Sequence, residues 1–397
     1  MKRKYVIIVP DGAADHPIPQ LGGKTIFEAA RIPNLDSIAR DGIQGLCYTV
    51  PPDLQPGSDV AMMAVLGYNA REYYTGRAPI EAVAQNIPLS ETDWVFRCNL
   101  VTIENGKMID HSSGNLTSEE GKELIEEMNR CCSNDNVRFY PGVGYRHLMV
   151  VHGMDFTGLT TFPPHDNIGK SVESIVPEGT NAEFLRSLIK RSQEILPQHK
   201  VNIARRTNEQ RQANSVWFWG EGKKARMELF EKKYGLKGAA ITAVDLVRGL
   251  ARLIGFEVLN VEGATGYVNT NFAGKGKTAI EALDKYDIVL VHIEATDEAG
   301  HAGDAETKVR ALELVDEHII GPVMEHLKKY PAWRILVMPD HPTPVATKSH
   351  VADAVPFAIA GDGIQPQKGL PFSEFNAAQS RLLIQHGYEL MKLFLGN

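Results

Sequence analysis

Two adjacent residues near the C-terminus, Asp340 and His341, have side chains of the types that bind divalent metal ions in proteins. They directly follow the apolar run Arg334–Met338, and His350 comes one loop later. An adjacent Asp-His pair packs poorly at the end of a buried strand, whereas a metal ion at that position would use both side chains. The pattern therefore predicts a strand that ends in a metal site.

The remaining candidate ligands follow two other apolar runs. Asp11 comes directly after Tyr5–Pro10, and Asp297 and His301 come a few residues after Asp287–Ile293. In an open α/β sheet, ligands bind at the carboxyl ends of the strands, so we expect these strand ends to converge. The predicted ligand set is three carboxylates and three imidazoles: Asp11, Asp297, Asp340, His301, His341 and His350.

This mixture of ligands indicates both the kind of metal and the number of ions. Carboxylates together with imidazoles suit Mn²⁺ or Zn²⁺, and they suit Mg²⁺ less well because Mg²⁺ favours oxygen ligands and water. Six protein ligands exceed what one ion takes while it keeps an open position for chemistry. Two ions that share the six side chains, with a serine or phosphate oxygen between them, are the economical interpretation.

Ser58 is the candidate nucleophile. It follows a loop rich in Pro and Gly and precedes a helical stretch that begins at Asp59, so the sequence predicts it at a helix N-cap. A free serine hydroxyl is too weak an acid to react at neutral pH, but a nearby metal ion and the positive end of a helix both favour its alkoxide. Taken singly, Asp11 is as compatible with helix capping as with metal binding, and a serine such as Ser58 is more often a plain cap. Only their occurrence together with the other ligands favours the chemical interpretation.

The elements that must position these residues form a repeating strand–helix pattern. Apolar runs of strand length alternate with amphipathic stretches of helix length, which is typical of βαβ units and a parallel sheet. The predicted fold class is therefore α/β, with a doubly wound, mostly parallel sheet. The expected strands are Tyr5–Pro10, Val216–Trp219, Ala239–Ala243, Glu257–Val261, Asp287–Ile293, Arg334–Met338 and Phe357–Ala360.

One long segment interrupts this pattern. Between residues 86 and 211, short alternating runs mix with two helical stretches, Ser118–Cys131 and Asn181–Ile195. This texture is typical of an α+β module rather than of a parallel sheet. We therefore predict a discontinuous catalytic domain, residues 1–85 and 212–397, and an inserted α+β domain, residues 86–211.

Composition and charge exclude several classes of protein. The chain has 397 residues, a formal net charge of −7 and four cysteines, and none of its apolar stretches approaches the length of a membrane span. Nucleic acid and membrane are therefore not expected partners, whereas a small anionic substrate held by a metal or a basic pocket is. A reduced, cytoplasmic setting fits the cysteine content. The sequence does not report the oligomeric state.

The motifs resemble those of the alkaline phosphatase superfamily and, within it, those of the archaeal-type 2,3-bisphosphoglycerate-independent phosphoglycerate mutases. The resemblance covers nearly the whole chain and includes VPDGAAD, LQPGSDVAMMAVLGY, VHIEATDEAGHAGD and MPDHPTP. It implies a phosphatase-like catalytic domain in which Ser58 is phosphorylated during turnover. It also implies a division of the ligands between two metal ions, with Asp297, His301 and His350 on one ion, and Asp11, Ser58, Asp340 and His341 on the other.

The resemblance further implies the reaction, which belongs to glycolysis and gluconeogenesis. The phosphoryl group of 3-phosphoglycerate moves to the serine and returns to the 2-hydroxyl, so the enzyme is a metal-dependent isomerase. Mn²⁺ is the expected ion, with Zn²⁺, Co²⁺ and Mg²⁺ as alternatives. The inserted domain would close over the site and exclude water. His111, Arg146 and Lys223 correspond to substrate contacts, and Lys223 stands where many related sequences have arginine.

Two other activities would use the same residues. A metal-dependent phosphatase would pass the phosphoryl group from the serine to water, and a phosphotransferase would phosphorylate another small alcohol, as has been proposed for homoserine in part of this family. The inserted domain and the mutase motifs argue against the phosphatase. A conventional ATP-dependent kinase is not expected, because the run Gly274–Thr278 does not complete a nucleotide-binding P-loop. Asn271 stands where the first glycine of that motif would fall.

Overall fold

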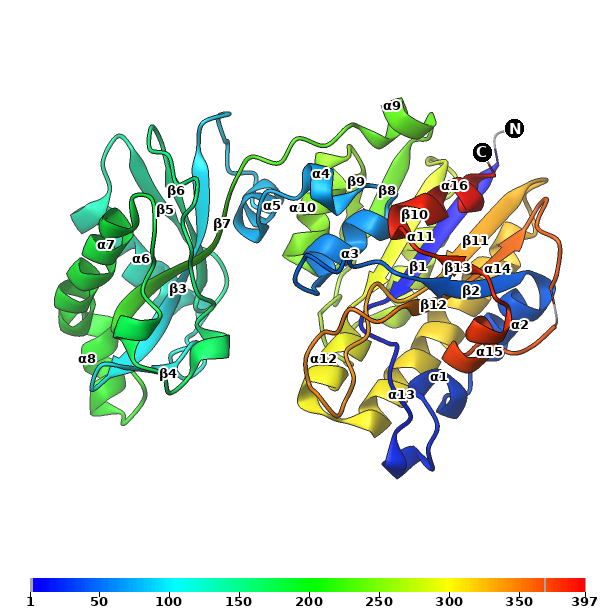
Figure 1. Cartoon of the computed structure of the whole chain (residues 1–397), viewed down its shortest axis with the longest axis horizontal. Coiled ribbons are helices and arrows are strands. Elements are labelled where there is room, and N and C mark those ends of the chain that lie inside the picture. Colours follow the sequence, from blue (N-terminus) through cyan, green and yellow to red (C-terminus); the bar gives the residue numbers. More distant parts are fainter. Residues whose placement is uncertain (1–2, 368, 397) are drawn as a thin grey trace. The chain divides into compact units, whose positions relative to one another are not determined.

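The computed structural model describes residues 3–367 and 369–396, and the chain divides into two compact units (Figure 1). The first unit contains Met1–Tyr74 and Arg226–Asn397, and the second contains Thr75–Ala225. The second unit thus begins earlier and ends later than the predicted insertion, residues 86–211.

Local packing explains the wider boundaries of the second unit. The helix α5, Arg77–Ala84, packs against the strands β3, Trp94–Glu104, and β7, Ser215–Lys223. Strand β7 pairs antiparallel with β3 along most of its length. The prediction that Val216–Trp219 belongs to the parallel sheet is therefore wrong, because an apolar run of strand length does not reveal which partner strand it will choose.

The first unit is built on an eight-stranded sheet with the order β13-β2-β12-β11-β1-β10-β8-β9. Neighbouring strands from β11 to β9 are parallel, while β12 is antiparallel to β11 and to β2. This arrangement confirms the predicted α/β class with a mostly parallel sheet. The strands are β1, Lys4–Pro10; β2, Ile43–Cys47; β8, Gly238–Ile241; β9, Glu257–Leu259; β10, Ile288–Ile293; β11, Trp333–Val337; β12, Val355–Gly361; and β13, Leu383–Ile384.

Strand β1 shows why this sheet forms the core of the first unit. Its residues from Val6 to Val9 have no exposed surface, and a continuous run of β-branched residues is typical of a parallel strand covered on both faces. Helices of the same unit pack against the sheet (Figure 1). The helices that contact its strands are α2, Pro33–Asp41; α10, Asp245–Leu253; α11, Phe272–Ala282; α12, Ala295–Ala302; α15, Glu374–Gln379; and α16, Leu390–Leu395. The other α-helices of the unit are α1, Ile26–Ala29; α3, Ser58–Val65; α4, Ala70–Tyr73; α9, Phe230–Tyr234; α13, Ala305–Val315; and α14, Gly321–Leu327.

The register of the parallel strands brings the carboxyl ends of three neighbouring strands together. Pro10 at the end of β1 pairs with Ile293 at the end of β10, and Ile8 pairs with Val337 at the end of β11. The carboxyl ends of β1, β10 and β11 therefore lie side by side. The candidate ligands Asp11, Asp297 and Asp340 follow these three strands within a few residues.

The second unit has an antiparallel sheet in the order β4-β3-β6-β5, with β7 on the free part of β3. It is of the α+β type that the sequence predicts. Within the described residues of both units, no helix combines the length and the apolar character that crossing a membrane requires. The further elements of the second unit are β4, Lys107–Asp110; β5, Val137–Tyr140; β6, Arg146–Val151; α6, Ser118–Cys132; α7, Ala182–Ile195; and α8, Lys200–Thr207.

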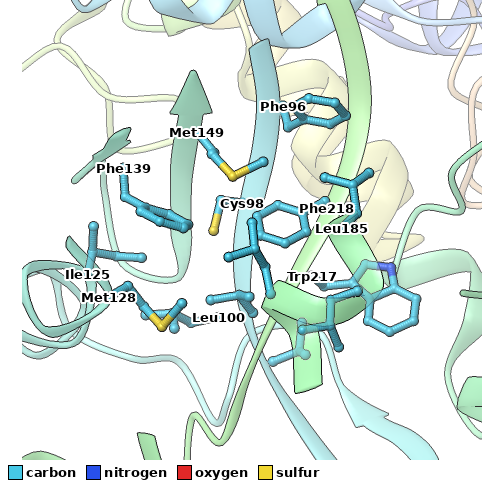
Figure 2. Close-up of a cluster of buried hydrophobic side chains, with 14 of the residues drawn as sticks. Phe96, Cys98, Leu100, Ile125, Met128, Phe139, Met149, Leu185, Trp217 and Phe218 are labelled. Carbon is cyan, nitrogen blue, oxygen red and sulfur yellow. The ribbon is translucent and has the colours of Figure 1, made fainter. Parts of the chain in front are cut away.

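A separate hydrophobic core stabilises the second unit (Figure 2). Alternate residues of β3, Phe96 and Cys98 among them, point into it and meet Phe218 of β7. Helix α6 covers this face, and it begins with a capping box in which the side chains of Thr117 and Glu120 each accept a backbone N–H of the other. The unit therefore buries its own apolar surface.

Candidate metal and nucleophile site

The first group of candidate ligands consists of Asp297, His301 and His350, whose ligand atoms all lie within 4.8 Å of one another. Asp297 and His301 are four residues apart on α12, so they lie on the same face of that helix. His301 Nε2 is 3.2 Å from Asp297 Oδ2, and His350 Nε2 is 3.4 Å from Asp297 Oδ1. The two imidazole Nε2 atoms are 2.9 Å apart, so both rings direct a nitrogen at the same point.

The second group consists of Asp11, Asp340 and His341, again with ligand atoms within 4.8 Å of one another. His341 Nε2 lies 3.5 Å from Asp11 Oδ1 and 3.5 Å from Asp340 Oδ2. Ser58 joins this group, because its Oγ is 3.1 Å from the same nitrogen. All three ligand side chains are completely buried, and Ser58 is 8% exposed.

In each carboxylate of the second group, one oxygen has a hydrogen-bond partner and the other, here called the bare oxygen, has none. Asp11 Oδ2 lies 2.9 Å from His292 Nε2, and Asp340 Oδ1 accepts hydrogen bonds from the backbone N–H groups of Gly12 and His341. Asp11 Oδ1 and Asp340 Oδ2 are buried and have no hydrogen-bond partner. A buried carboxylate oxygen without a donor is costly, so the residues fit a cation that contacts both bare oxygens.

The pKa shifts in and beside the second group reflect burial and repulsion between carboxylates. Burial, reinforced by the charges of Asp340, Glu294 and Asp297, raises the pKa of Asp11 well above its ordinary value. Burial and the charge of Asp297 raise the pKa of Glu294 to about 8. Because like charges at close range disfavour ionisation, a divalent cation would relieve the repulsion that these shifts reflect.

The first group differs because its members already stabilise one another. Burial acts to raise the pKa of Asp297, but the hydrogen bonds from His301 and His350 outweigh it and hold that pKa well below the ordinary value. The hydrogen bond with Asp297 raises the pKa of His301 to about 9. The other ring nitrogen of His301 lies 2.9 Å from the Lys348 carbonyl oxygen, which orients the ring toward the group.

Ser58 does not cap its helix. It is the first residue of α3, Gly57 is the N-cap, and no side chain caps this terminus. The prediction of Ser58 at the N-cap is therefore wrong by one residue, and the hydroxyl points to His341 instead. A Cβ at Gly57 would lie 2.8 Å from Asp59 Oδ1, so a larger residue there would displace the Asp59 side chain. The serine still lies at the positive end of a helix, where an alkoxide is favoured.

Sequence reasoning missed two residues beside the second group. His292 and Glu294 form a further cluster with Asp11 whose ligand atoms lie within 4.8 Å of one another. Both ring nitrogens of His292 have partners, since Nδ1 lies 3.2 Å from Thr242 Oγ1 and Nε2 faces Asp11. The signal in the sequence is a single histidine inside the buried apolar run of β10.

The three predicted substrate residues all lie in the second unit. The rings of His111 and Tyr145 are 5.5 Å apart, and the Arg146 guanidinium lies 5.5 Å from the Tyr145 ring, so His111 and Arg146 share Tyr145 as a neighbour. Lys223 is not part of this arrangement. Its Nζ lies 3.5 Å from Asp155 Oδ1.

A buried arginine that the sequence did not single out lies near this pair. Arg97 is 7% exposed, bonds Glu81 at 2.9 Å and stacks on the Trp219 ring at 4.1 Å. Burial, reinforced by the charges of Arg77 and Arg146 and opposed by that of Glu81, lowers the pKa of Arg97 to about 10. The ring of His165, which also contacts Trp219, lies 6.1 Å from that of His111. We name Arg77, Arg97, His111, Arg146 and His165 the basic cluster, and its excess of positive charge favours an anion.

Comparisons with known proteins agree with this geometry. A family model described as 2,3-bisphosphoglycerate-independent phosphoglycerate mutase matches residues 39–202. A protein of that name from Methanothrix thermoacetophila is 46% identical over 99% of both chains, and a probable enzyme of that name from Geobacter sulfurreducens is 44% identical over 99% of both.

Two solved structures resemble the whole chain. A protein from Pyrococcus horikoshii is 31% identical with a TM-score of 0.85, covering 100% of this chain and 97% of the other. A cofactor-independent phosphoglycerate mutase from Thermoplasma acidophilum is 26% identical with a TM-score of 0.68, covering 100% of this chain and 99% of the other.

Proposed function

The chain belongs to the 2,3-bisphosphoglycerate-independent phosphoglycerate mutase family, and we propose that it interconverts 3-phosphoglycerate and 2-phosphoglycerate through a phosphoserine at Ser58. Phosphoglycerate mutases of this family are metal-dependent isomerases. The observation that carries the proposal is the position of Ser58 Oγ, 3.1 Å from His341 Nε2, the atom that also lies 3.5 Å from each of the two carboxylate oxygens without a hydrogen-bond partner. A cytoplasmic setting, with the reaction serving glycolysis, is part of the proposal, and no disulfide joins the four cysteines.

The proposal includes two divalent metal ions, for which Mn²⁺ is the first choice. Asp297, His301 and His350 would hold one ion, and Asp11, Ser58, Asp340 and His341 would hold the other. Zn²⁺, Co²⁺ and Mg²⁺ are the alternatives that the ligand chemistry allows. When bound, the ions supply positive charge that stabilises the serine alkoxide and the phosphoryl oxygens.

Ser58 carries the phosphoryl group between the two hydroxyls of one glycerate. Ser58 Oγ forms a bond to phosphorus as the bond from phosphorus to the 3-oxygen breaks, and the proton lost by Ser58 ends on that 3-oxygen. The 2-hydroxyl then takes the phosphoryl group back and its proton returns to Ser58. The sum is an isomerisation that consumes neither water nor a second substrate.

The second unit is proposed to bind the anionic groups of the substrate and to exclude water during turnover. Its basic cluster supports this role, because it contains three arginines, and Glu81 pairs with two of them, Arg77 and Arg97. The side chains proposed for substrate contact are His111, Arg146 and Lys223. Among them Lys223 has a competing partner in Asp155, so we expect its replacement to matter least.

Phosphorus NMR of the purified enzyme with 3-phosphoglycerate tests the proposal. We expect 2-phosphoglycerate to form without free phosphate, and Ser58→Ala to stop its formation, while Ser37→Ala on α2 serves as a matched control. Free phosphate as the main product would show a phosphatase instead. Incubation with homoserine and ATP in parallel would detect the kinase, and phosphohomoserine without mutase activity would overturn the proposal.

A further inference from the structure

Thr343 lies two residues beyond His341 and contacts a member of each ligand group. The side chain is completely buried. Its Oγ1 donates a hydrogen bond to Asp297 Oδ1 in the first group and lies 3.3 Å from His341 Nδ1 in the second. A single hydroxyl therefore lies between two sets of side chains that the metal proposal assigns to different ions.

The direction of these two hydrogen bonds follows from the chemistry of the partners. Asp297 is a carboxylate that already faces His301 and His350, so it accepts, and the one hydroxyl proton of Thr343 goes to it. The Thr343 oxygen can then only accept from His341, which places a proton on His341 Nδ1.

This tautomer leaves the other ring nitrogen of His341 with its lone pair. His341 Nε2 is the atom that lies 3.1 Å from Ser58 Oγ and 3.5 Å from a carboxylate oxygen of both Asp11 and Asp340. A metal ion binds the unprotonated nitrogen of a neutral imidazole. The hydroxyl of Thr343 thus favours the tautomer in which the Nε2 atom of His341 is available to a ligand.

The backbone of Thr343 is held rigidly enough to impose this direction. Lys308 Nζ, a buried amine paired with Asp15, donates to the Thr343 carbonyl at 2.8 Å. The Thr343 N–H donates to the Gly12 carbonyl at 3.2 Å. Gly300 of α12 packs so closely against the Thr343 carbonyl that a Cβ would collide with it. Segments after β1 and from α12 and α13 therefore fix the residue.

We propose that Thr343 is a positioning residue that couples the two ligand groups, because it selects the Nδ1–H tautomer of His341 and orients the Asp297 carboxylate in the same hydrogen-bond chain. The inference rests on the proposed metal sites and deepens them. Thr343 does not touch the reacting atoms. It acts through His341 and Asp297, so its loss is expected to weaken both groups at once rather than one of them.

Two variants separate the hydroxyl from the space that it fills. Thr343→Ser keeps the hydroxyl, and Thr343→Val keeps the shape but removes the donor and acceptor. We expect Thr343→Val to bind Mn²⁺ about 10- to 100-fold more weakly in both groups, the range typical of lost partners behind a metal ligand, and Thr343→Ser to stay within a few-fold of the natural protein. Calorimetric titration of the metal-free proteins with Mn²⁺ measures this, and thermal unfolding shows that each variant is folded.

Nitrogen NMR of the natural metal-free protein provides a measurement that needs no Thr343 variant. With labelled histidine, at a pH well above the ordinary histidine pKa, we expect the His341 ring to carry its proton on Nδ1. The signal is assigned by its absence in His341→Gln. A proton on Nε2, or equal Mn²⁺ affinity in the valine and serine variants, would overturn the inference. If the natural protein itself binds no Mn²⁺, the metal proposal fails instead.

Discussion

The two ligand groups differ in what holds them together before any ion binds. In the group of Asp297, His301 and His350, the ligand atoms contact one another, and the two imidazoles are 38% and 20% exposed. In the group of Asp11, Asp340 and His341, every side chain is completely buried. Two carboxylate oxygens of that group, Asp11 Oδ1 and Asp340 Oδ2, have no partner.

This difference indicates which of the two groups gains more stability from a bound cation. Two imidazoles close to one carboxylate satisfy much of each other's charge, and water reaches them. Two carboxylates in a buried place, with one imidazole between them, leave negative charge that neither protein nor water neutralises. We therefore expect the group that contains Ser58 to bind its ion more tightly and to be destabilised more when the ion is removed.

Complete removal of metal is expected to have the largest effect. We predict that chelation lowers mutase activity on the order of 10³-fold or more, because loss of one charge-stabilising group from an active site already costs about 10²- to 10³-fold, and that added Mn²⁺ restores it. Metal analysis during stepwise chelation should show the ion of the exposed group leaving first. Full activity after exhaustive chelation would contradict metal dependence, and simultaneous loss of both ions would contradict the difference between the groups.

Neutralising one carboxylate in each group should change the stability of the metal-free protein in opposite directions. Asp297→Asn removes an acceptor from two imidazoles and is expected to lower the free energy of unfolding by about 1.5–3 kcal/mol. Asp11→Asn removes a charge that burial and neighbouring carboxylates disfavour, and it is expected to raise the free energy of unfolding by ~1 kcal/mol or more at neutral pH.

Urea unfolding of the two asparagine variants, with and without saturating Mn²⁺, measures this pair of effects. With Mn²⁺ present both variants should be less stable than the natural protein, because each has lost a metal ligand. A change of the same sign in the metal-free variants would show that the two groups are electrostatically alike.

A smaller effect concerns pH and the exposed group. The hydrogen bond with Asp297 raises the pKa of His301 from 6.5 to about 9. A raised histidine pKa contributes stability that is fully present below 6.5 and is lost as the pH rises through about 9. We expect the metal-free protein to lose stability across this range, and His301→Asn to remove most of that slope. A slope that is unchanged in the variant would assign the pH dependence to other residues.

Much of the site could be predicted because its residues follow continuous apolar runs. Strands β1, β10 and β11 are buried except for the first residues of β1 and β11. Their carboxyl ends are therefore visible in the sequence as the points where Asp11, Glu294 and Pro339 interrupt the apolar runs. The parallel pairing of the three strands then brings Asp11, Asp297 and Asp340 together. Convergence at one edge is a property of the fold class and needs no knowledge of individual contacts.

The parts that escaped prediction depend on contacts between distant segments. The sequence analysis assigned β7 to the wrong sheet. Its true partner is β3, and the paired residues Val101 and Ser215 are more than a hundred residues apart in the sequence. His292 looks like a core histidine until its contact with Asp11 is known. Arg97 lies in an alternating strand, and only its burial against Trp219 and Glu81 distinguishes it from a surface arginine.

The location of the phosphoryl group during turnover tests the role of Ser58 most directly. Enzyme that is turning over 3-phosphoglycerate would be quenched in acid and its peptides sequenced by mass spectrometry. We predict phosphoserine at Ser58 in the natural protein, and no phosphorylated peptide in Ser58→Ala. A phosphoryl group on another residue, or formation of 2-phosphoglycerate with no phosphorylated enzyme, would contradict the proposed route.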